Sequence, residues 1–540
     1  MPGEIARYNQ QSGLIEAADG WRVYMREATE PVDAVEPICE RETIAAFPQA
    51  VLGRAFLLAK CGHVAAAKRQ LKAFRESIQG GMLPTLANDF VLVETHVRVY
   101  ADEALGSKQE HRLLAVLDAL PDQDAIGRAL AHNHLSTVSL HRGEFDKAQD
   151  YAEAAMRLFR QDGAEFGSLH LHTHLGQIRL MRGDLRGAEA QFQEMDERLN
   201  RLPGAAGRLR AVGRVLRSEV AYEMNDLPSS ADLLKNAMDS VEENDAWLDV
   251  LATAYRVSTR LALSQSGLPG ALTALSHGEQ AARHRTMPRL LRLMQIERVR
   301  ALTLCDELDE ARAEMAKIGL TPEHPDSDTA QDWALRHGSS VVAQARWLVR
   351  ARRARAALDF LGPAEDFAIR GGQLLVLAKL RVIRALAHWR LNARTEATSS
   401  LLSSIRLLGR QPFRRFMLDE GQDAMAIVQA ALDGDHVTIL PAPEQRHRLA
   451  ELTHYWAIQS NAPKAETNAA LQRAQSASGK VLQRRYLELL AHGHSNKEIG
   501  RTMGVSANTV KYHLKRIFRE LRVHNRSRAV RRARELGIVE

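Results

Sequence analysis

Apolar residues recur at helical spacing along most of the chain, and the clearest case is a pair of predicted helices near the C-terminus. Each helix carries its apolar residues on one face, Ile499 and Met503 on the first, and Val510, Leu514, Ile517, Phe518 and Leu521 on the second. Gly504 stands between the helices and supplies a left-handed residue at which the first helix ends. The pattern predicts a helix-turn-helix that spans Asn496 to Lys515.

The polar residues of this segment cap the two helices and form a cationic face. Ser495 and Glu498 have the spacing of a capping box, in which each side chain accepts from a free backbone N–H, and Ser506 can cap the second helix. The face opposite the apolar stripe suits the major groove of DNA, where cationic side chains reach phosphates and guanine edges. The residues predicted to contact DNA are Asn508, Thr509, Lys511, Tyr512, Lys515, Arg516 and Arg519.

Further upstream, between residues 46 and 435, a turn recurs every 37 to 46 residues, and in most copies a small residue follows five positions later. A small side chain at that point lets two helices approach closely, so the pattern predicts stacked helical hairpins. The predicted turns lie at Gly62, Gly106, Gly143, Gly183, Asn225, Ser266, Asp306, Arg352 and Asn392. The small partners are Ala67, Ala148, Ala188, Ser230, Ala271, Ala311, Ala357 and Ala397.

The C-terminal segment resembles the LuxR/FixJ-type DNA-binding domain of bacterial regulators from about Val481 onward. The matching residues are Leu489, Leu490, Ala491, Gly493, Ser495 to Ile499, Thr509, Val510, Lys511 and His513. The resemblance implies a four-helix domain in which Thr509, Lys511, Tyr512 and Lys515 touch DNA. The departures from the family pattern are Gly479-Lys480 and Gln483 before the first helix and Arg528 early in the last one.

The repeated hairpins look like tetratricopeptide repeats with a lengthened period, as in the sensor domain of MalT-like regulators. The copies around Gly143 and Gly183 carry the likeness most clearly. The predicted fold is all-α, with a solenoid of about nine hairpins followed by the four-helix domain. The predicted domains are a helical lead-in at 1–45, the solenoid at 46–435, a linker with a short helix at 436–478, and the DNA-binding domain at 479–540.

Large regulators of this kind carry an ATPase ahead of the solenoid. In this chain the candidate for a P-loop is Gly479-Lys480, which is followed by Val481 and has Ala474 in place of the first glycine. The phosphate cradle therefore lacks two required residues. The chain resembles such a regulator without its ATPase domain.

The net charge of +7 is divided unevenly between the two parts of the chain. Residues 479–540 hold 15 Lys and Arg against 5 Asp and Glu, or +10, whereas the rest holds 58 against 61, or −3. This distribution is typical of a nucleic-acid module joined to a non-basic body, and it predicts strongly salt-dependent binding. The three widely separated cysteines and the absence of a long apolar run favour a cytoplasmic protein without membrane attachment.

Arginines recur at equivalent positions of the predicted hairpins. The residue six positions before the turn is expected on the inner surface of the solenoid, and it is arginine in three consecutive repeats: Arg260, Arg300 and Arg346. Because guanidinium groups pair with carboxylates and phosphates, these residues and Arg256 are the predicted site for an acidic ligand or partner segment. The alternative is that the arginines are solvated or paired within the chain.

Histidines are densest around His170, His172 and His174, with His132 and His134 on the neighbouring helix. His170 and His174 share a helical face at the spacing by which two imidazoles can hold one metal ion. No cysteine lies nearby to complete a tetrahedral site, so a structural or pH-responsive role is favoured. We predict neither a metal nor a cofactor.

These features together predict a bacterial transcriptional regulator whose solenoid senses an effector or partner protein and controls promoter binding. The expected partners are double-stranded promoter DNA, RNA polymerase, an unidentified effector and further copies of the chain. A single module of this size buries only about 600–1,000 Å² on DNA, which is why an oligomer is expected. No catalytic motif is present, so an enzyme is not predicted. The alternatives are a tetratricopeptide-type interaction scaffold and a sigma-factor-like promoter subunit.

Overall fold

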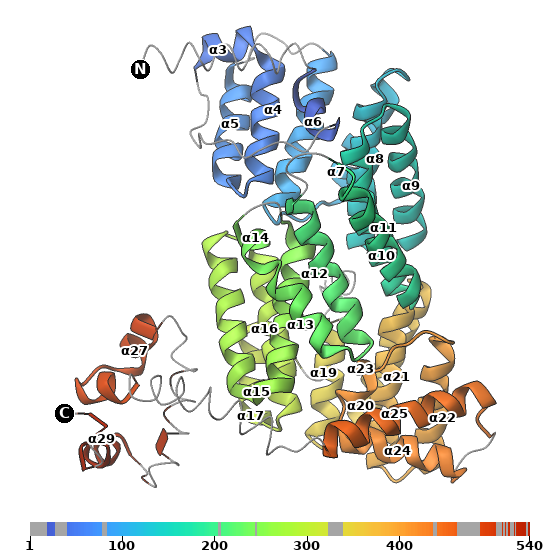
Figure 1. Ribbon diagram of the computed structural model, residues 1–540, viewed down its shortest axis with the longest axis vertical. Helices are drawn as coiled ribbons and strands as arrows, with labels where there is room; N and C mark the ends of the chain where they lie inside the picture. Colours follow the sequence, from blue (N-terminus) through green and yellow to red (C-terminus); the bar gives the residue numbers. More distant parts are fainter. Residues whose placement is uncertain are drawn as a thin grey trace.

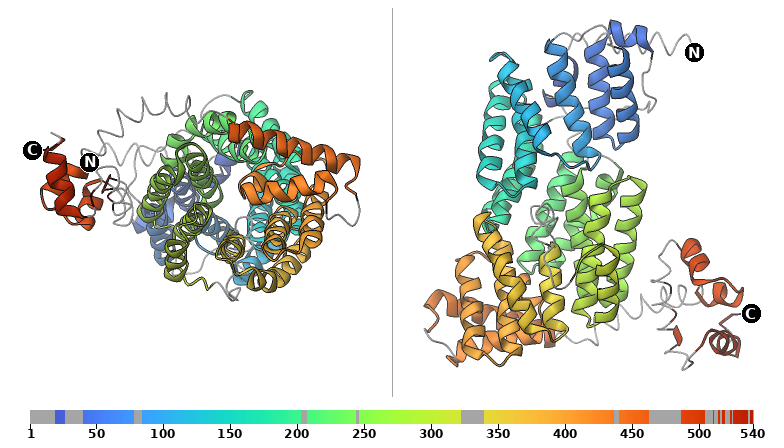
Figure 2. Two further views of the ribbon diagram at one scale, coloured as in Figure 1. Left: turned by 90° about the horizontal axis from the view of Figure 1, so that it is seen from below. Right: turned by 180° about the vertical axis from the view of Figure 1, so that it is seen from behind.

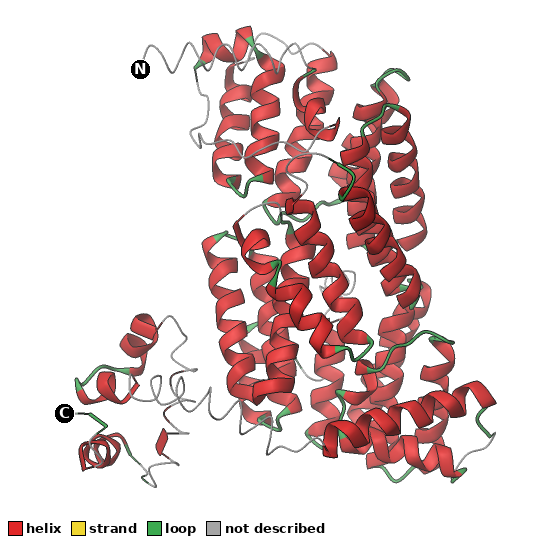
Figure 3. Cartoon of the chain, in the orientation of Figure 1, coloured by secondary structure: helices red, strands yellow, loops and turns green. Residues whose placement is uncertain are grey.

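Helices of the solenoid form consecutive pairs that stack along a superhelix (Figure 1). The computed structural model describes residues 19–26, 40–77, 84–202, 207–243, 246–321, 339–435, 440–461, 486–503 and 525–535, and positions 510, 514, 517, 518, 523, 538 and 539. Every regular element within these residues is a helix (Figure 3). The prediction of an all-α fold is confirmed.

The N-terminal half begins with two short elements, η1 (Gly20–Arg22) and α2 (Val23–Arg26). α3 (Arg41–Ala46) then leads into the first pair. The pairs that follow are α4 (Pro48–Lys60) with α5 (Val64–Ser77), α6 (Pro84–Tyr100) with α7 (Ser107–Ala119), α8 (Ala125–His141) with α9 (Phe145–Gln161), and α10 (Glu165–Met181) with α11 (Leu185–Leu199).

The second half continues the same arrangement with one long, broken helix. Its elements are α12 (Gly207–Glu223), α13 (Leu227–Lys235), α14 (Met238–Glu243), α15 (Leu248–His284), α16 (Pro288–Leu304), α17 (Leu308–Lys317), α19 (Ser339–Arg350), α20 (Ala354–Arg370), α21 (Leu374–Arg390), α22 (Arg394–Leu407), α23 (Arg415–Leu418), α24 (Gln422–Asp433) and α25 (Pro443–Asn461). α15 breaks at Gly267, with φ 65° and ψ −162°, so its two halves form a pair of their own. α25 lies in the segment 436–478, which was predicted to be a linker with a short helix.

Most hairpin turns contain a residue with left-handed backbone at the predicted position. The turn residues with positive φ include Gly62, Gly143, Gly183, Asn225, Asp306, Arg352 and Asn392. The turn predicted at Ser266 has its left-handed residue one position later, at Gly267.

The turn predicted at Gly106 is wrong by four residues. The left-handed residue is Asp102, with φ 56°, and Gly106 has an extended backbone just before α7. The Asp102 carboxylate accepts hydrogen bonds from the backbone N–H of Arg289, at 2.8 Å, and from its guanidinium, at 2.7 Å. This contact across 187 residues holds the aspartate in a conformation that glycine would adopt more readily.

The small residue five positions after each turn is fully buried in all eight predicted copies. The side chains with 0% exposure are Ala67, Ala148, Ala188, Ser230, Ala271, Ala311, Ala357 and Ala397. Protein interiors have few voids, so a larger side chain at these positions would push the two helices apart.

Helices from distant parts of the sequence meet inside the superhelix. In the view along its axis, the pairs are arranged in a ring (Figure 2). α10 contacts α21, and α12 contacts α23, although each pair of helices is widely separated in the sequence. Contacts between successive turns of the superhelix therefore stabilise the solenoid, in addition to contacts between neighbouring repeats.

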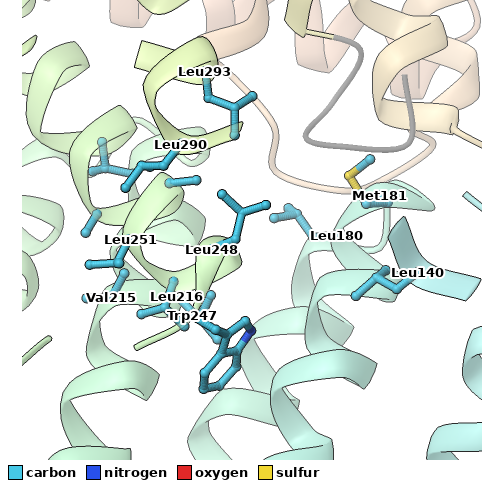
Figure 4. Packing of buried hydrophobic residues seen from close by; sticks show 14 of the residues in the cluster. Leu140, Leu180, Met181, Val215, Leu216, Trp247, Leu248, Leu251, Leu290 and Leu293 are labelled. Carbon is cyan, nitrogen blue, oxygen red and sulfur yellow. The ribbon is translucent and has the colours of Figure 1, made fainter. Parts of the chain in front are cut away.

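Apolar packing is continuous through the solenoid, and one core cluster contains buried residues from α4 to α25. Figure 4 shows Val215 and Leu216 of α12 near Leu248 and Leu251 of α15, and all four side chains are buried. In the C-terminal part of the chain, a second and separate core forms around Leu487. Among the helices that the structure describes, none has the length and apolar character needed to cross a membrane.

Replacement of Ala67 by leucine tests the role of the small residues. We expect Ala67→Leu to lower the free energy of unfolding by about 1–3 kcal/mol, because its methyl group is enclosed between α4 and α5. Ala65→Leu, on the exposed side of α5, is the matched control and should change stability by less than about 0.5 kcal/mol. Urea unfolding followed by circular dichroism measures both, and equal effects would contradict the packing role.

Candidate DNA-binding domain and arginine cavity

The first helix of the predicted helix-turn-helix is present as α27 (Asn496–Met503). Its capping box is formed: the Ser495 backbone N–H donates to Glu498 Oε2 at 2.7 Å, and the Glu498 N–H donates to Ser495 Oγ at 3.3 Å. The hydrogen bond from the Ser495 backbone lowers the pKa of Glu498. The N-terminus of α27 therefore begins at the predicted residue.

The last helix of the domain, α29 (Arg526–Glu535), is capped without an acidic residue in its first turn. The Asn525 side chain accepts a hydrogen bond from the Arg528 backbone N–H at 2.9 Å. Asparagine is a strong N-cap, so Asn525 caps α29 although Arg528 departs from the family pattern in its first turn.

The apolar stripe of the second helix lies in the core of the domain. Val510, Leu514 and Ile517 are 0%, 5% and 4% exposed, and they belong to one cluster with Ile499 of α27. Gly504, Ser506 and all the residues predicted to contact DNA lie outside the described residues. The predicted DNA contacts are Asn508, Thr509, Lys511, Tyr512, Lys515, Arg516 and Arg519. Their assignment stays a prediction.

In the solenoid, the three predicted inner arginines meet around one cavity. Arg260 on α15, Arg300 on α16 and Arg346 on α19 line a space of about 470 Å³ that is partly open to solvent. Each arginine is less than 10% exposed. Arg256 lies one helical turn from Arg260, but it is not part of this lining.

Carboxylates from within the chain pair with all four arginines. Arg256 pairs with Glu219 at 2.5 Å, and Arg260 pairs with Glu297 at 2.6 Å. Arg300 donates to Asp419 at 2.6 Å, and Arg346 donates through Nε to both carboxylate oxygens of Glu420 at 2.9 and 3.0 Å. The structure thus shows intramolecular pairing on the surface predicted to bind an acidic ligand.

Charge compensation keeps these buried groups ionised. Burial alone raises the pKa of Glu297, but the charges of Arg260 and Arg300 outweigh burial and hold the pKa at about 2. The pKa of Asp419 is held at about 2 in the same way, by Arg415 and Arg300 against burial. Burial lowers the pKa of Lys379, which donates to Glu223 at 2.9 Å on the same cavity wall. The cavity is a network of opposite charges rather than a uniformly cationic surface.

Asp419 and Glu420 belong to residues 411–421, which we call the crossing segment. It joins α22 to α24, contains the single helical turn α23, and contacts α12 and α21 (Figure 1). Phe413, Met417 and Leu418 within it are 0–2% exposed. The role of this segment was not predicted from the sequence. The signal available there was a pair of consecutive acidic residues that follows an apolar run, at a point where the repeat pattern stops.

Comparison with known proteins identifies both parts of the chain. A family model described as "MalT-like TPR region" matches residues 101–433, which is more than half of the chain. This chain belongs to the MalT-like TPR family. A second model, described as "Bacterial regulatory proteins, luxR family", matches residues 483–533.

Similarity to individual curated proteins covers about a tenth of the chain. The chain is 53% identical over 47 residues to the putative HTH-type transcriptional regulator YhjB of Escherichia coli, which is 9% of this chain and 24% of that protein. It is 47% identical over 53 residues to the HTH-type transcriptional regulator AlkS of Alcanivorax borkumensis, which is 10% of this chain and 6% of that protein. The matches thus span a quarter or less of these relatives.

The MalT-like solenoid has a structural relative among solved proteins. It is similar to a Rap protein complexed with competence and sporulation factor, with a TM-score of 0.51, 11% sequence identity, and coverage of 69% of this chain and 100% of that chain. At this identity the likeness supports the solenoid fold alone.

The histidine group lines another cavity, in the N-terminal half of the MalT-like solenoid. His134, His170 and His174 face a space of about 510 Å³ together with Lys60 and Trp247. His170 Nε2 lies 3.0 Å from Lys60 Nζ, and His174 Nδ1 lies 3.1 Å from Ser136 Oγ. Within the described part of the chain, no group of three or more His, Cys, Asp or Glu is placed to hold a metal ion. The contacts of His170 and His174 are those of histidines that pack and hydrogen-bond inside the fold.

Burial of two of these histidines makes the stability of the fold depend on pH. It lowers the pKa of His134 to about 3 and that of His174 to about 4, because a charged imidazole loses hydration there. The folded pKa thus lies below the unfolded value of 6.5. Below about pH 6.5 the unfolded chain binds protons that the folded chain does not, so stability falls with decreasing pH.

A pH series therefore tests the histidine contribution. Between pH 6.5 and pH 4.5 we expect each of His134 and His174 to cost about 1 kcal/mol of stability per pH unit. The double variant His134→Gln/His174→Gln should show a shallower loss of unfolding free energy with acidification than the wild type. His447→Gln, whose side chain is 77% exposed, is the control and should leave the slope unchanged. Identical slopes for all three proteins would contradict the assignment.

Proposed function

We propose that this protein is a DNA-binding transcriptional regulator whose solenoid responds to an effector and controls promoter binding by the C-terminal domain. The observation that carries the proposal is the LuxR-family match at residues 483–533 on a domain with a formed capping box. The +10 charge of residues 479–540, against −3 for the remainder, supports a role in nucleic-acid binding.

The proposed reading face consists of the residues predicted to contact DNA. Val510, Leu514 and Ile517 are buried, and we propose that the face opposite them, on a helix of 3.6 residues per turn, is the one that reads DNA. Thr509, Lys511, Tyr512 and Lys515 are the proposed base-reading and phosphate-contacting residues. Promoter recognition by an assembly of several copies, in contact with RNA polymerase, completes the proposal.

Control by the solenoid requires an effector that binds two conformations unequally. The proposed effector surface is the inner surface around Arg260, Arg300 and Arg346, where cations from three repeats converge. A change there reaches the C-terminal domain through α24 and α25, which follow the crossing segment in the sequence.

Alanine substitutions at the reading face test DNA binding. We expect Lys511→Ala and Lys515→Ala each to weaken specific binding by about 1–3 kcal/mol, because each removes a cationic contact to a base edge or phosphate. Lys72→Ala changes net charge by the same amount on the solenoid, where the side chain is 78% exposed, and should leave affinity unchanged. Fluorescence anisotropy on promoter fragments obtained by genome-wide footprinting measures all three.

The same experiment separates the alternative functions. Specific binding that survives the double Lys511→Ala/Lys515→Ala change would contradict the proposed reading face. Absence of any footprint would favour an interaction scaffold. DNA binding that occurs only in the presence of core RNA polymerase would favour a sigma-factor-like subunit.

A further inference from the structure

We infer that the crossing segment is an internal ligand of the solenoid, and that the external ligand it excludes is a peptide with an apolar run before two consecutive acidic residues. The inference rests on the proposed sensing role of the solenoid and names the ligand class and the regulation of that site. The geometry points to it because residues 411–421 make, within one chain, the contacts that a bound peptide would make with the arginine cavity.

Two neighbouring carboxylates of the crossing segment pair with arginines from two different repeats. Asp419 accepts from Arg300 at 2.6 Å and from the Tyr222 hydroxyl at 2.9 Å. Glu420 accepts from Nε of Arg346 at 2.9 and 3.0 Å. Such charge-assisted hydrogen bonds, from two guanidinium groups that are both held by packing, give geometric specificity for a pair of carboxylates.

Backbone groups of the crossing segment are also recognised. The Arg414 N–H donates to the carbonyl oxygen of Glu223 at 2.8 Å, and Arg350 donates to the carbonyl oxygen of Glu420 at 3.0 Å. The segment's first side chain adds further contacts: Gln411 Nε2 donates to Asp184 at 2.9 Å, and Gln411 Oε1 accepts from the Arg186 N–H at 3.0 Å. Contacts to main-chain donors and acceptors are features of peptide recognition, which a small dicarboxylate could not reproduce.

Apolar side chains of the crossing segment complete the likeness to a bound peptide. Phe416 forms part of the cavity wall beside Ile296 and Val342. Phe416, Met417 and Leu418 are 4%, 0% and 2% exposed. A peptide that replaces the segment therefore needs apolar residues ahead of its acidic pair.

Donor capacity remains at the cavity beyond what the crossing segment uses. Arg300 Nη1 and Arg346 Nη1 are buried, and neither has a hydrogen-bond partner among the described residues. Both arginines line the cavity and are 6% and 5% exposed. Buried N–H groups of this kind are normally satisfied, so a ligand that meets them gains contacts that Asp419 and Glu420 leave unmade.

Exchange of the segment for a peptide would loosen one set of contacts at the end of the solenoid. The crossing segment ties α24, which starts at Gln422, to α12, α16 and α19 through the bonds described above. Because it is tethered, it acts at an effective concentration that an external peptide must exceed or match with tighter contacts. Its displacement removes the tie between α24 and these three helices, while α24 stays packed against α21 and α22, and thereby alters how α24 and α25 connect to the DNA-binding domain.

A vacated site tests this inference in the full-length chain. The variant Asp419→Asn/Glu420→Gln removes both charges and nearly preserves shape. The probe is a fluorescein-labelled synthetic peptide with the sequence of residues 412–421. We expect it to bind the double variant at least about tenfold more tightly than the wild type, because the competing internal carboxylates are gone. A peptide with Asn-Gln in place of Asp-Glu should lose that gain.

Several controls make the outcome decisive. Asp423→Asn, just outside the segment and paired with Arg390, should bind the probe as the wild type does. If the double variant is unfolded by circular dichroism, the single variant Glu420→Gln, which keeps the Asp419–Arg300 pair, takes its place and should still bind more tightly than the wild type. Equal binding by wild type and the folded variant, or equal binding of the Asp-Glu and Asn-Gln peptides, would overturn the inference. Competition by succinate as effective as that by the peptide would also overturn it.

DNA binding is measured separately on the wild-type protein. If the protein gives specific footprints but the variant and wild type bind the peptide equally, the proposed DNA-binding function stands and the internal-ligand inference is wrong. Peptide exchange without footprints would establish the ligand site and remove the proposed function.

Discussion

Close approach of paired helices, permitted by one small side chain after each turn, is the constraint on which the solenoid depends. A fully buried alanine or serine recurs at this position through eight repeats. The turn before it needs a left-handed residue, which is glycine in some copies and asparagine, aspartate or arginine in others. Because each pair repeats the same spacing, small rotations accumulate into a superhelix whose inner surface collects equivalent positions from successive repeats.

Equivalent inner positions bring charges of the second half together in the protein interior. Buried ions are costly unless they are paired and hydrogen-bonded, and an ion pair inside a protein adds little net stability over apolar packing. The chain nevertheless places Arg260, Arg300 and Arg346 there and supplies a carboxylate for each. Such a network contributes more to specific recognition than to stability, which is why its occupation by the crossing segment bears on function.

The sequence was sufficient for features that depend on neighbouring residues and insufficient for those that depend on distant ones. Turns such as Gly143, their small partners such as Ala148, and the Ser495–Glu498 capping box follow local rules and were predicted at the correct residues. The turn at Asp102 was misplaced because its conformation depends on Arg289, 187 residues away. The arginines were predicted on the inner surface, but Asp419, the partner of Arg300, lies 119 residues away from it and outside the repeat pattern. No periodicity reports such a contact.

Contacts between successive turns of the superhelix also limit how the array can evolve. Arg289 reaches back to Asp102, and Gln411 reaches back to Asp184, so the register of one turn against the next is specified by side chains. An open array of repeats can gain or lose a unit and keep its remaining interfaces. Here a duplication or deletion of one hairpin between the contacting residues would break these contacts. Recombination among homologous repeats should therefore be tolerated at the ends of this solenoid far better than in its middle.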